Sequence, residues 1–206
     1  MNFRNVDRKL CVIQDNRFVL AIDPERKTLA NAVLFCGYID HNKGISYEAM
    51  GLIRCEGDAY VLVPNAPPVG LKVRADTVDE RLVKPFKDKK LEDQFRSRID
   101  LLAVYYSDKD VVETRRYEEF DPFRNQHYPD DICALFLTPE HRLERMWVRA
   151  KKAVRTDSGT LLLRGRLLNE PRTIPSLHIG ENVTLTVIET RHGKQCVGIP
   201  GLQWTI

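Results

Sequence analysis

The chain has little of what marks membrane-spanning, secreted or disulfide-stabilised proteins. Its longest purely apolar runs, such as residues 101–106 and 133–137, are far shorter than the roughly 20 residues that a membrane helix requires. Residues 1–7 contain no apolar segment typical of a secretory signal. The five cysteines stand singly and form no CxxC pair, a pattern typical of reduced thiols rather than of a disulfide framework or a zinc site. We therefore expect a cytoplasmic protein without a membrane segment.

The motifs of common enzyme classes are also missing from the sequence. There is no GxSxG, no Walker-type loop, no HExxH and no GxGxxG, and the five histidines are too scattered for a metal site. One loop, residues 118–131, contains acids and a histidine that could bind a divalent metal or transfer protons, although a solvated polar loop has the same composition. We predict no catalytic residue, no metal and no cofactor, and keep a metal-dependent enzyme using this loop as a second alternative.

Charge is distributed unevenly, although the formal net charge is only +3. Residues 141–206 hold eleven Lys and Arg against five Asp and Glu, whereas residues 108–131 hold eight acids against four bases. Two interpretations follow from this pattern. The segments are solvated surfaces with matching charges, or the basic segment is a cationic binding face that the acidic segment partly covers.

The local patterns predict an α+β protein. We expect a mixed N-terminal domain at residues 1–114, with antiparallel strands and one or two helices, a polar acidic linker or loop at 115–131, and a β-rich module at 132–206. In the first domain, alternation, turn residues and apolar spacing predict these elements: strands at 9–14 and 17–23, a helix at about 24–36, a hairpin of 47–54 with 59–63, a helix at about 90–101, and a buried strand at 102–106.

Two patterns compete at residues 138–154. Thr138 followed by Pro139 could begin a helix with an apolar stripe. Strand alternation would instead place Met146 and Val148 on one face, and the strand would pair across the turn at 157–159 with residues 161–167. That pairing would bring together, on the opposite face, Arg145, Trp147, Arg149, Arg164 and Arg166. The residue pattern by itself leaves both structures open.

Three short segments carry a resemblance to a known family. Residues 144–148 read Glu-Arg-Met-Trp-Val, residues 165–171 contain Leu-Leu-Asn-Glu-Pro, and residues 177–183 contain Ile-Gly-Glu-Asn-Val. On these motifs the region from about 128 to 189, under a third of the chain, resembles the YegJ-like family of bacterial domains of unknown function. The resemblance implies that 144–148 is a strand of a small antiparallel sheet or SH3-like barrel, and we therefore expect a strand there. The sequence departs from the family after residue 189, where an acidic-Trp pair is absent and the next tryptophan is Trp204.

The resemblance also implies a class of function. Similar domains occur among bacterial accessory proteins near toxin–immunity and phage-conflict systems, so we expect a non-enzymatic protein that binds a protein partner, with an immunity or inhibitor role as the specific form. The expected partner-binding residues are Arg145, Trp147, Arg149, Arg164 and Arg166. Burial in the core is the other interpretation of Trp147. The alternative function is nucleic-acid binding through the cationic face of the β module.

Overall fold

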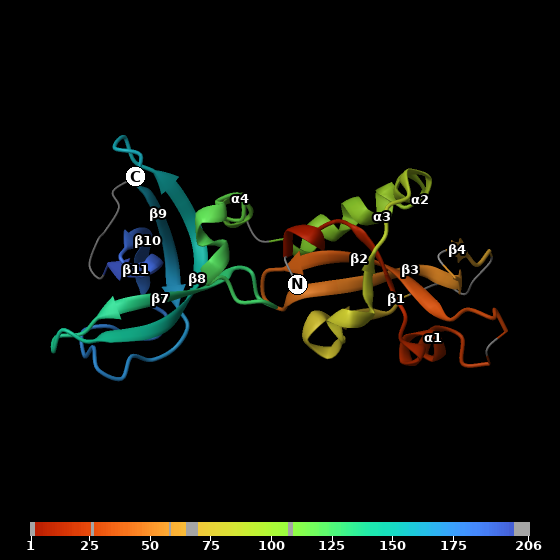
Figure 1. Ribbon diagram of the computed structural model, residues 1–206, viewed down its shortest axis with the longest axis horizontal. Helices are drawn as coiled ribbons and strands as arrows, with labels where there is room; N and C mark the ends of the chain where they lie inside the picture. Colours follow the sequence, from red (N-terminus) through yellow and green to blue (C-terminus); the bar gives the residue numbers. More distant parts are fainter. Residues whose placement is uncertain (1–2, 26, 58, 65–69, 107–108, 200–206) are drawn as a thin grey trace. The chain divides into compact units, whose positions relative to one another are not determined.

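The protein folds into two compact units, residues 1–106 and 107–206, which are described separately (Figure 1). The computed structural model describes residues 3–25, 27–57, 59–64, 70–106 and 109–199. Both helices and antiparallel strands are present, so the expected α+β class is confirmed. Among the described residues, no helix combines the length and the apolar character needed to cross a membrane.

An antiparallel sheet forms the centre of the first unit, with strand order β4-β3-β2-β1-β6 and with β5 also paired to β3. Its strands are β1 (Leu10–Ile13), β2 (Ala32–Asp40), β3 (Gly44–Glu56), β4 (Ala59–Leu62), β5 (Lys72–Arg74) and β6 (Val83–Pro85). The helices are α1 (Asn16–Ile22), α2 (Lys89–Gln94) and α3 (Arg96–Leu101), with 3-10 turns η1 (Phe3–Asn5), η2 (Ala75–Thr77), η3 (Glu80–Leu82) and η4 (Leu102–Tyr105).

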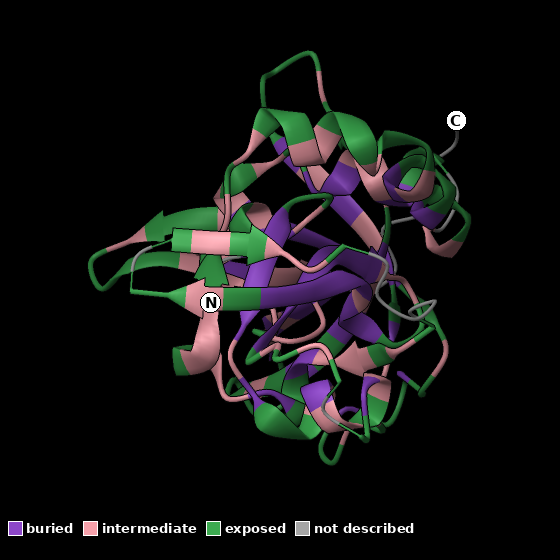
Figure 2. Cartoon of the chain, turned by 90° about the vertical axis from the view of Figure 1, so that its right-hand side faces the viewer, coloured by how far each residue is buried: buried purple, intermediate pink, exposed green. Residues whose placement is uncertain are grey.

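The sheet is buried on both faces. Val33 and Phe35 of β2 pack in a cluster that includes α1, whereas Leu34 and Cys36, which point the other way, pack in a cluster that includes α2 and α3. Figure 2 shows the buried strands in purple and the outward sides of the helices in green. Because successive residues of a strand point to opposite faces, two covered faces need an uninterrupted apolar run. Residues 32–39 are such a run and are all buried.

This double burial explains why the expected helix at 24–36 is wrong. The apolar residues that suggested a helix belong to β2. The predicted helix start at Asp23 is instead a turn. In this turn the Asp23 carboxylate accepts hydrogen bonds from Thr28 N at 2.8 Å and from Lys27 N at 3.1 Å. The expected strand at 17–23 is also wrong, because the residues form α1. Its N-cap is Asp15, whose carboxylate accepts a bond from Arg17 N at 2.9 Å.

Three other expectations for the first unit can be compared directly. The hairpin of 47–54 with 59–63 is confirmed by the pairing of β3 and β4 around Gly57. The helix at about 90–101 is confirmed, with an interruption at Phe95 between α2 and α3. The strand expected at 102–106 is wrong, because the residues form η4, in which Leu102 is buried and Val104 is 77% exposed.

The second unit is a closed five-stranded barrel with strand order β10-β11-β7-β8-β9. The strands are β7 (Asp131–Leu137), β8 (Leu143–Arg155), β9 (Leu161–Leu167), β10 (Asn182–Thr190) and β11 (Gly193–Ile199), preceded by α4 (Lys109–Thr114) and η5 (Glu118–Phe123). Neighbouring strands are antiparallel except β11 and β7, whose pairing is parallel. Apolar side chains from every strand fill the interior.

The structure resolves the choice at residues 138–154 in favour of a strand. β8 pairs with β9 around the turn at 157–159, where Gly159 has a φ of +82°. Met146 and Val148 are fully buried in the barrel. Gly165 of β9 lies so close to β8 that an added Cβ would stand 2.4 Å from a methyl group of Val148 and 2.6 Å from the carbonyl oxygen of Arg149. The interior of the barrel therefore has no room for a side chain at residue 165.

Residues 115–131, expected to be a polar linker or loop, belong to the folded second unit. The division between units falls at 106/107 rather than at 114, so α4 belongs to the barrel unit. Phe120 of η5 is fully buried in the barrel core, and Arg115 forms a buried ion pair with Asp130. The acidic residues that made this segment look solvated are needed as partners for arginines, which only the folded chain reveals.

Candidate partner-binding surface

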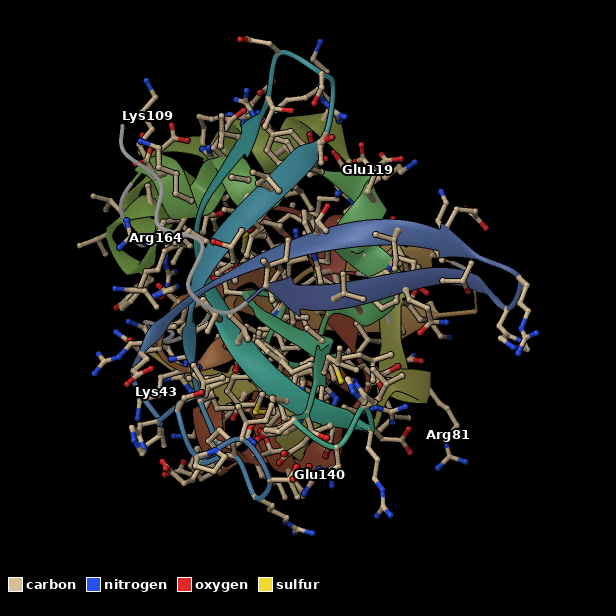
Figure 3. The ribbon with its side chains drawn as sticks, turned by 90° about the vertical axis from the view of Figure 1, so that its left-hand side faces the viewer. Lys43, Arg81, Lys109, Glu119, Glu140 and Arg164 are labelled. Carbon is tan, nitrogen blue, oxygen red and sulfur yellow. The ribbon has the colours of Figure 1, made fainter. Side chains whose placement is uncertain are left out.

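The five expected partner-binding residues all lie on the outward side of β8 and β9. In β8 they alternate with the buried Met146 and Val148, and in β9 they alternate with inward-facing residues such as Gly165. The register pairs Arg149 with Arg166, and after an irregularity between Ala150 and Lys152 it pairs Lys152 with Arg164. We call the surface formed by Arg145, Trp147, Arg149, Arg164 and Arg166 the Arg/Trp face. Figure 3 shows Arg164 at the outer edge of the barrel.

Trp147 is a surface residue. Its side chain points away from the core and is 37% exposed, so the interpretation that the indole fills the barrel core is wrong. Its cross-strand neighbour in β7 is Cys133, which is half-buried on the same side. Partial burial raises the pKa of the Cys133 thiol, so a smaller fraction of it is in the reactive thiolate form. The indole therefore lies on a half-apolar surface that water reaches.

Apolar side chains extend the Arg/Trp face toward the end of the β7–β8 hairpin. Leu137 and Leu143 form the last cross-strand pair of the two strands, and they are 58% and 64% exposed. Leu135, which pairs with Arg145, is half-buried on the same side. Exposed leucines next to an exposed tryptophan are typical of surfaces that another macromolecule covers.

The four arginines of the face differ in their surroundings. Arg149 is held by the Asp131 carboxylate, with its Nε and Nη2 donating bonds of 2.7 and 3.0 Å, and this pairing raises the pKa of Arg149. Arg166 donates from Nε to the carbonyl oxygen of Gly180 at 3.0 Å. Within the described ranges, Arg145 and Arg164 form no ion pair. Two of the guanidinium groups are thus positioned by the fold, and two are open to a ligand.

A cleft of about 500 Å³ adjoins the face and shares Arg145 with it. Its lining comes from both ends of the β7–β8 hairpin loop and from the segment that follows β9: Thr138, Arg142, Leu143, Glu144, Arg145, Asn169, Glu170, Arg172 and Thr173. The described part of the chain provides no ion pair for Arg142 or Arg172. Neither residue was predicted. They stand next to the motif segments in sequence, but only the folded hairpin brings them together.

The two carboxylates of the cleft are already occupied by hydrogen bonds. Glu144 accepts bonds from the backbone N–H of Arg172 at 2.7 Å and of Thr173 at 3.1 Å, and from the Thr173 hydroxyl at 2.6 Å. These bonds, that of the hydroxyl first, lower the pKa of Glu144. Glu170 accepts a bond from Ile179 N at 2.9 Å. Both carboxylates stay charged, but the lining has three arginines, Arg142, Arg145 and Arg172, so the cleft carries a net positive charge.

The residues that carry the family resemblance therefore have structural roles in this chain. Glu144 and Glu170 anchor the segment between β9 and β10, and Asn169 extends the edge of β8 by accepting a bond from Trp147 N at 2.8 Å with its Oδ1. Gly180 has a φ of +88°, a conformation that favours glycine. The motif specifies how this long connection packs on the barrel, and thereby the shape of the cleft.

The carboxylates of the acidic loop 118–131 form ion pairs and no metal site among the described residues. Its carboxylates pair with arginines in four cases: Asp121 with Arg124, Glu119 with Arg155, Asp130 with Arg115 and Asp131 with Arg149. Among the described residues, no group of three or more His, Cys, Asp or Glu side chains could hold a metal ion. The geometry of this loop is that of a charge-paired structural element.

Comparison of the chain with models of protein families, with curated proteins and with solved structures finds no match. The resemblance of residues 128–189 to the YegJ-like family remains a prediction from the motifs.

Proposed function

We propose that the second unit is a protein-binding module, an SH3-like barrel of the YegJ-like type, and that the Arg/Trp face with its cleft binds an acidic protein partner. The observation that carries the proposal is the exposure of Trp147 beside Arg145, which reaches both the face and the cleft. Trp and Arg are enriched among the few residues that supply most of the binding energy at the centres of protein interfaces. Unpaired guanidinium groups bind carboxylates through paired hydrogen bonds, which explains the preference for an acidic partner.

The exposed apolar residues favour a protein over a nucleic acid. Apolar side chains of a partner protein would cover Leu137 and Leu143. A phosphate backbone has no apolar surface that could cover them. The charge of Arg149 is also offset by Asp131. We propose that the protein acts in the bacterial cytoplasm as an immunity or inhibitor protein that covers an acidic surface of an effector, a role supported by the motif resemblance. Nucleic-acid binding through the cationic face formed by Arg145, Arg149, Arg164 and Arg166 is the alternative.

The proposal can be tested with matched charge reversals. Wild type, Arg145→Glu, Trp147→Ala and Lys194→Glu are used as baits in the native host, and captured proteins are quantified. Lys194 is exposed on β11 and lies outside the face and the cleft, so its reversal makes the same change in net charge. We expect one acidic protein whose capture is abolished by Arg145→Glu and by Trp147→Ala and kept with Lys194→Glu.

A salt titration against random-sequence DNA and RNA tests the alternative. If the face binds a protein, the wild type should show negligible affinity for both nucleic acids at physiological salt. A nucleic acid would replace the protein partner if the wild type binds tightly and its log affinity falls with log salt. The slope should then become shallower in Arg145→Ala/Arg164→Ala, by about 0.9 for each phosphate that the variant no longer neutralises.

A further inference from the structure

The first unit contains a cavity of about 790 Å³ that the proposed function does not use. It lies at the edge of the sheet formed by β1 and β6, beside α2 and α3. Four apolar residues contribute to it, Leu10, Pro85, Phe86 and Ile99, and five cations surround them, Arg8, Lys9, Lys87, Lys89 and Arg96. Asn5, Glu92 and Asp93 complete the lining. The volume lies within the range of pockets that bind small molecules.

The apolar part of the cavity is held in place by the fold. Leu10 and Ile99 are buried in the cluster between the sheet and α3. Phe86 N donates to the carbonyl oxygen of Leu10 at 3.0 Å, which continues the ladder of β1 and β6 beyond its last strand pair. The Phe86 ring meets the Tyr60 ring edge-on, with their centroids 5.5 Å apart. A half-exposed aromatic ring is thus fixed at the cavity, where a flat ligand can pack on it.

Within the described ranges, some of the cations at the rim bind acceptors of the protein, and others do not. Arg8 pairs with Asp100 at 2.5 Å, Arg96 lies 3.6 Å from Asp93, and Lys9 donates to the carbonyl oxygen of Arg4 at 2.7 Å. Lys87 and Lys89 have no ion pair within the residues that the structure describes. These two ammonium groups follow Phe86 in the chain by one and three residues.

The backbone at the rim adopts an uncommon conformation. Arg8 has a φ of +57°, which a residue with a side chain rarely adopts. The conformation is held by two bonds to β2, from Arg8 N to Gly37 O at 2.8 Å and from Gly37 N to Lys9 O at 3.0 Å. Such conformations persist where the surroundings determine them, and they gather at ligand sites.

We propose that this cavity binds a small organic anion that has a flat apolar body and an acidic group. The apolar body packs on the half-exposed Phe86 ring and on the exposed Pro85 beside it. The acidic group, a phosphate, sulfonate or carboxylate, takes hydrogen bonds from Lys87 and Lys89. A nucleotide and an aromatic acid share this chemistry. No residue belongs to both this cavity and the protein-binding surface of the second unit, so the two proposals are independent.

The experiment uses the full chain and the fluorescent aromatic sulfonate 1-anilinonaphthalene-8-sulfonate as the probe. We expect saturable binding of one molecule. Lys87→Ala/Lys89→Ala should raise the Kd about tenfold, as expected for the removal of a charge-assisted hydrogen bond. The matched control is Lys84→Ala/Lys90→Ala, which removes the same charge from the same stretch of chain at two exposed lysines that do not line the cavity. The control should leave the Kd within about twofold of wild type, since only long-range electrostatics change.

Competitors distinguish the two sources of the ligand. Displacement of the probe by adenosine monophosphate but not by 1-naphthoate identifies a nucleotide site, and the reverse identifies a site for aromatic acids. The proposal is overturned if the probe does not saturate, if both double variants weaken it equally, or if inorganic phosphate or adenosine displaces it as well as the compounds that combine a ring with an acid. Loss of probe binding in Trp147→Ala with no effect of Lys87→Ala/Lys89→Ala would place the probe on the second unit and overturn the proposal as well.

Discussion

Arg115 and Asp130 form a bidentate ion pair inside the second unit. The Nε and Nη2 atoms of Arg115 each donate a bond of 2.8 Å to a different carboxylate oxygen of Asp130, and the two side chains are only 6% and 3% exposed. The pair joins the chain after α4 to the residue before β7. It holds the segment 115–130, with Phe120 at its centre, against the barrel.

Removing one partner of this pair should lower the free energy of unfolding far more than replacing both partners with apolar residues. Asp130→Ala should lower the free energy of unfolding by about 3–5 kcal/mol, because a buried guanidinium loses its counter-charge. The double variant Arg115→Met/Asp130→Leu should lose less than Asp130→Ala in urea denaturation. A loss below about 1 kcal/mol for Asp130→Ala would contradict a structural role of the pair.

Trp147 and Met146 are neighbours on opposite sides of β8, so they test the placement of the indole. Met146→Ala should cost about 2–5 kcal/mol, because it opens a cavity in the core. Trp147→Ala should cost about 1 kcal/mol, the range of side-chain preferences in strands, while it abolishes partner capture. Equal losses of stability in the two variants, measured by chemical denaturation, would show that the Trp147 side chain is buried in the core.

The side chain of Asn169 substitutes for a backbone carbonyl beside β8. Asn169→Ala should destabilise the protein by about 1 kcal/mol, since Trp147 N loses its 2.8 Å partner. Asn169→Asp retains an acceptor oxygen and should recover most of that loss. Hydrogen exchange at the Trp147 amide gives the direct measurement, and unchanged protection in Asn169→Ala would contradict this role.

The exposed pair of His178 and Glu170 predicts a pH dependence. The hydrogen bond from Nδ1 of His178 to Glu170 at 2.9 Å raises the pKa of His178 above its ordinary 6.5, and the bonds from Ile179 N and His178 lower the pKa of Glu170 below its ordinary 4.5. The contribution of His178 is therefore complete below pH 6.5 and is lost as the pH rises through the raised pKa. The contribution of Glu170 is complete above pH 4.5 and is lost as the pH falls through the lowered pKa.

The difference in Tm between wild type and His178→Ala should consequently be greatest between pH 4.5 and 6.5 and should shrink on either side. His192→Ala, which removes another exposed histidine of the barrel unit, is the control for the loss of an exposed imidazole. A difference for His178→Ala that is constant with pH would show that the ion pair contributes nothing.

Among the residues that the structure describes, each buried cluster consists of residues from one unit. We therefore expect residues 1–106 and 107–206, expressed separately, to fold with dispersed amide spectra and cooperative thermal transitions. A shorter fragment that begins at residue 115 should fold poorly, because it lacks α4, whose Val111 is fully buried. Failure of 107–206 to fold would show that its barrel depends on the preceding residues.

Local pattern was sufficient where one face of an element is buried and its neighbour is close in sequence. Alternation around the turn at 157–159 predicted the outward row from Arg145 to Arg166, since the strand period determines which side each residue takes. The same holds for the hairpin of β3 and β4. For the choice between helix and strand at 138–154, alternation required the added weight of the motif resemblance.

Only the tertiary structure determined the remaining features. β2 was mistaken for a helix because its two faces are covered by elements distant in sequence, which removes the alternation that identifies a strand. The acids of 115–131 looked solvated because their arginine partners lie up to 36 residues away, as Arg155 does from Glu119. Arg142 and Arg172 line one cleft, because Glu144 accepts a hydrogen bond from the backbone N–H of Arg172, a contact that no spacing in the chain reveals. Residue types and their period determined the faces of single elements, whereas the pairing of charges and the cavities depend on which elements the fold brings together.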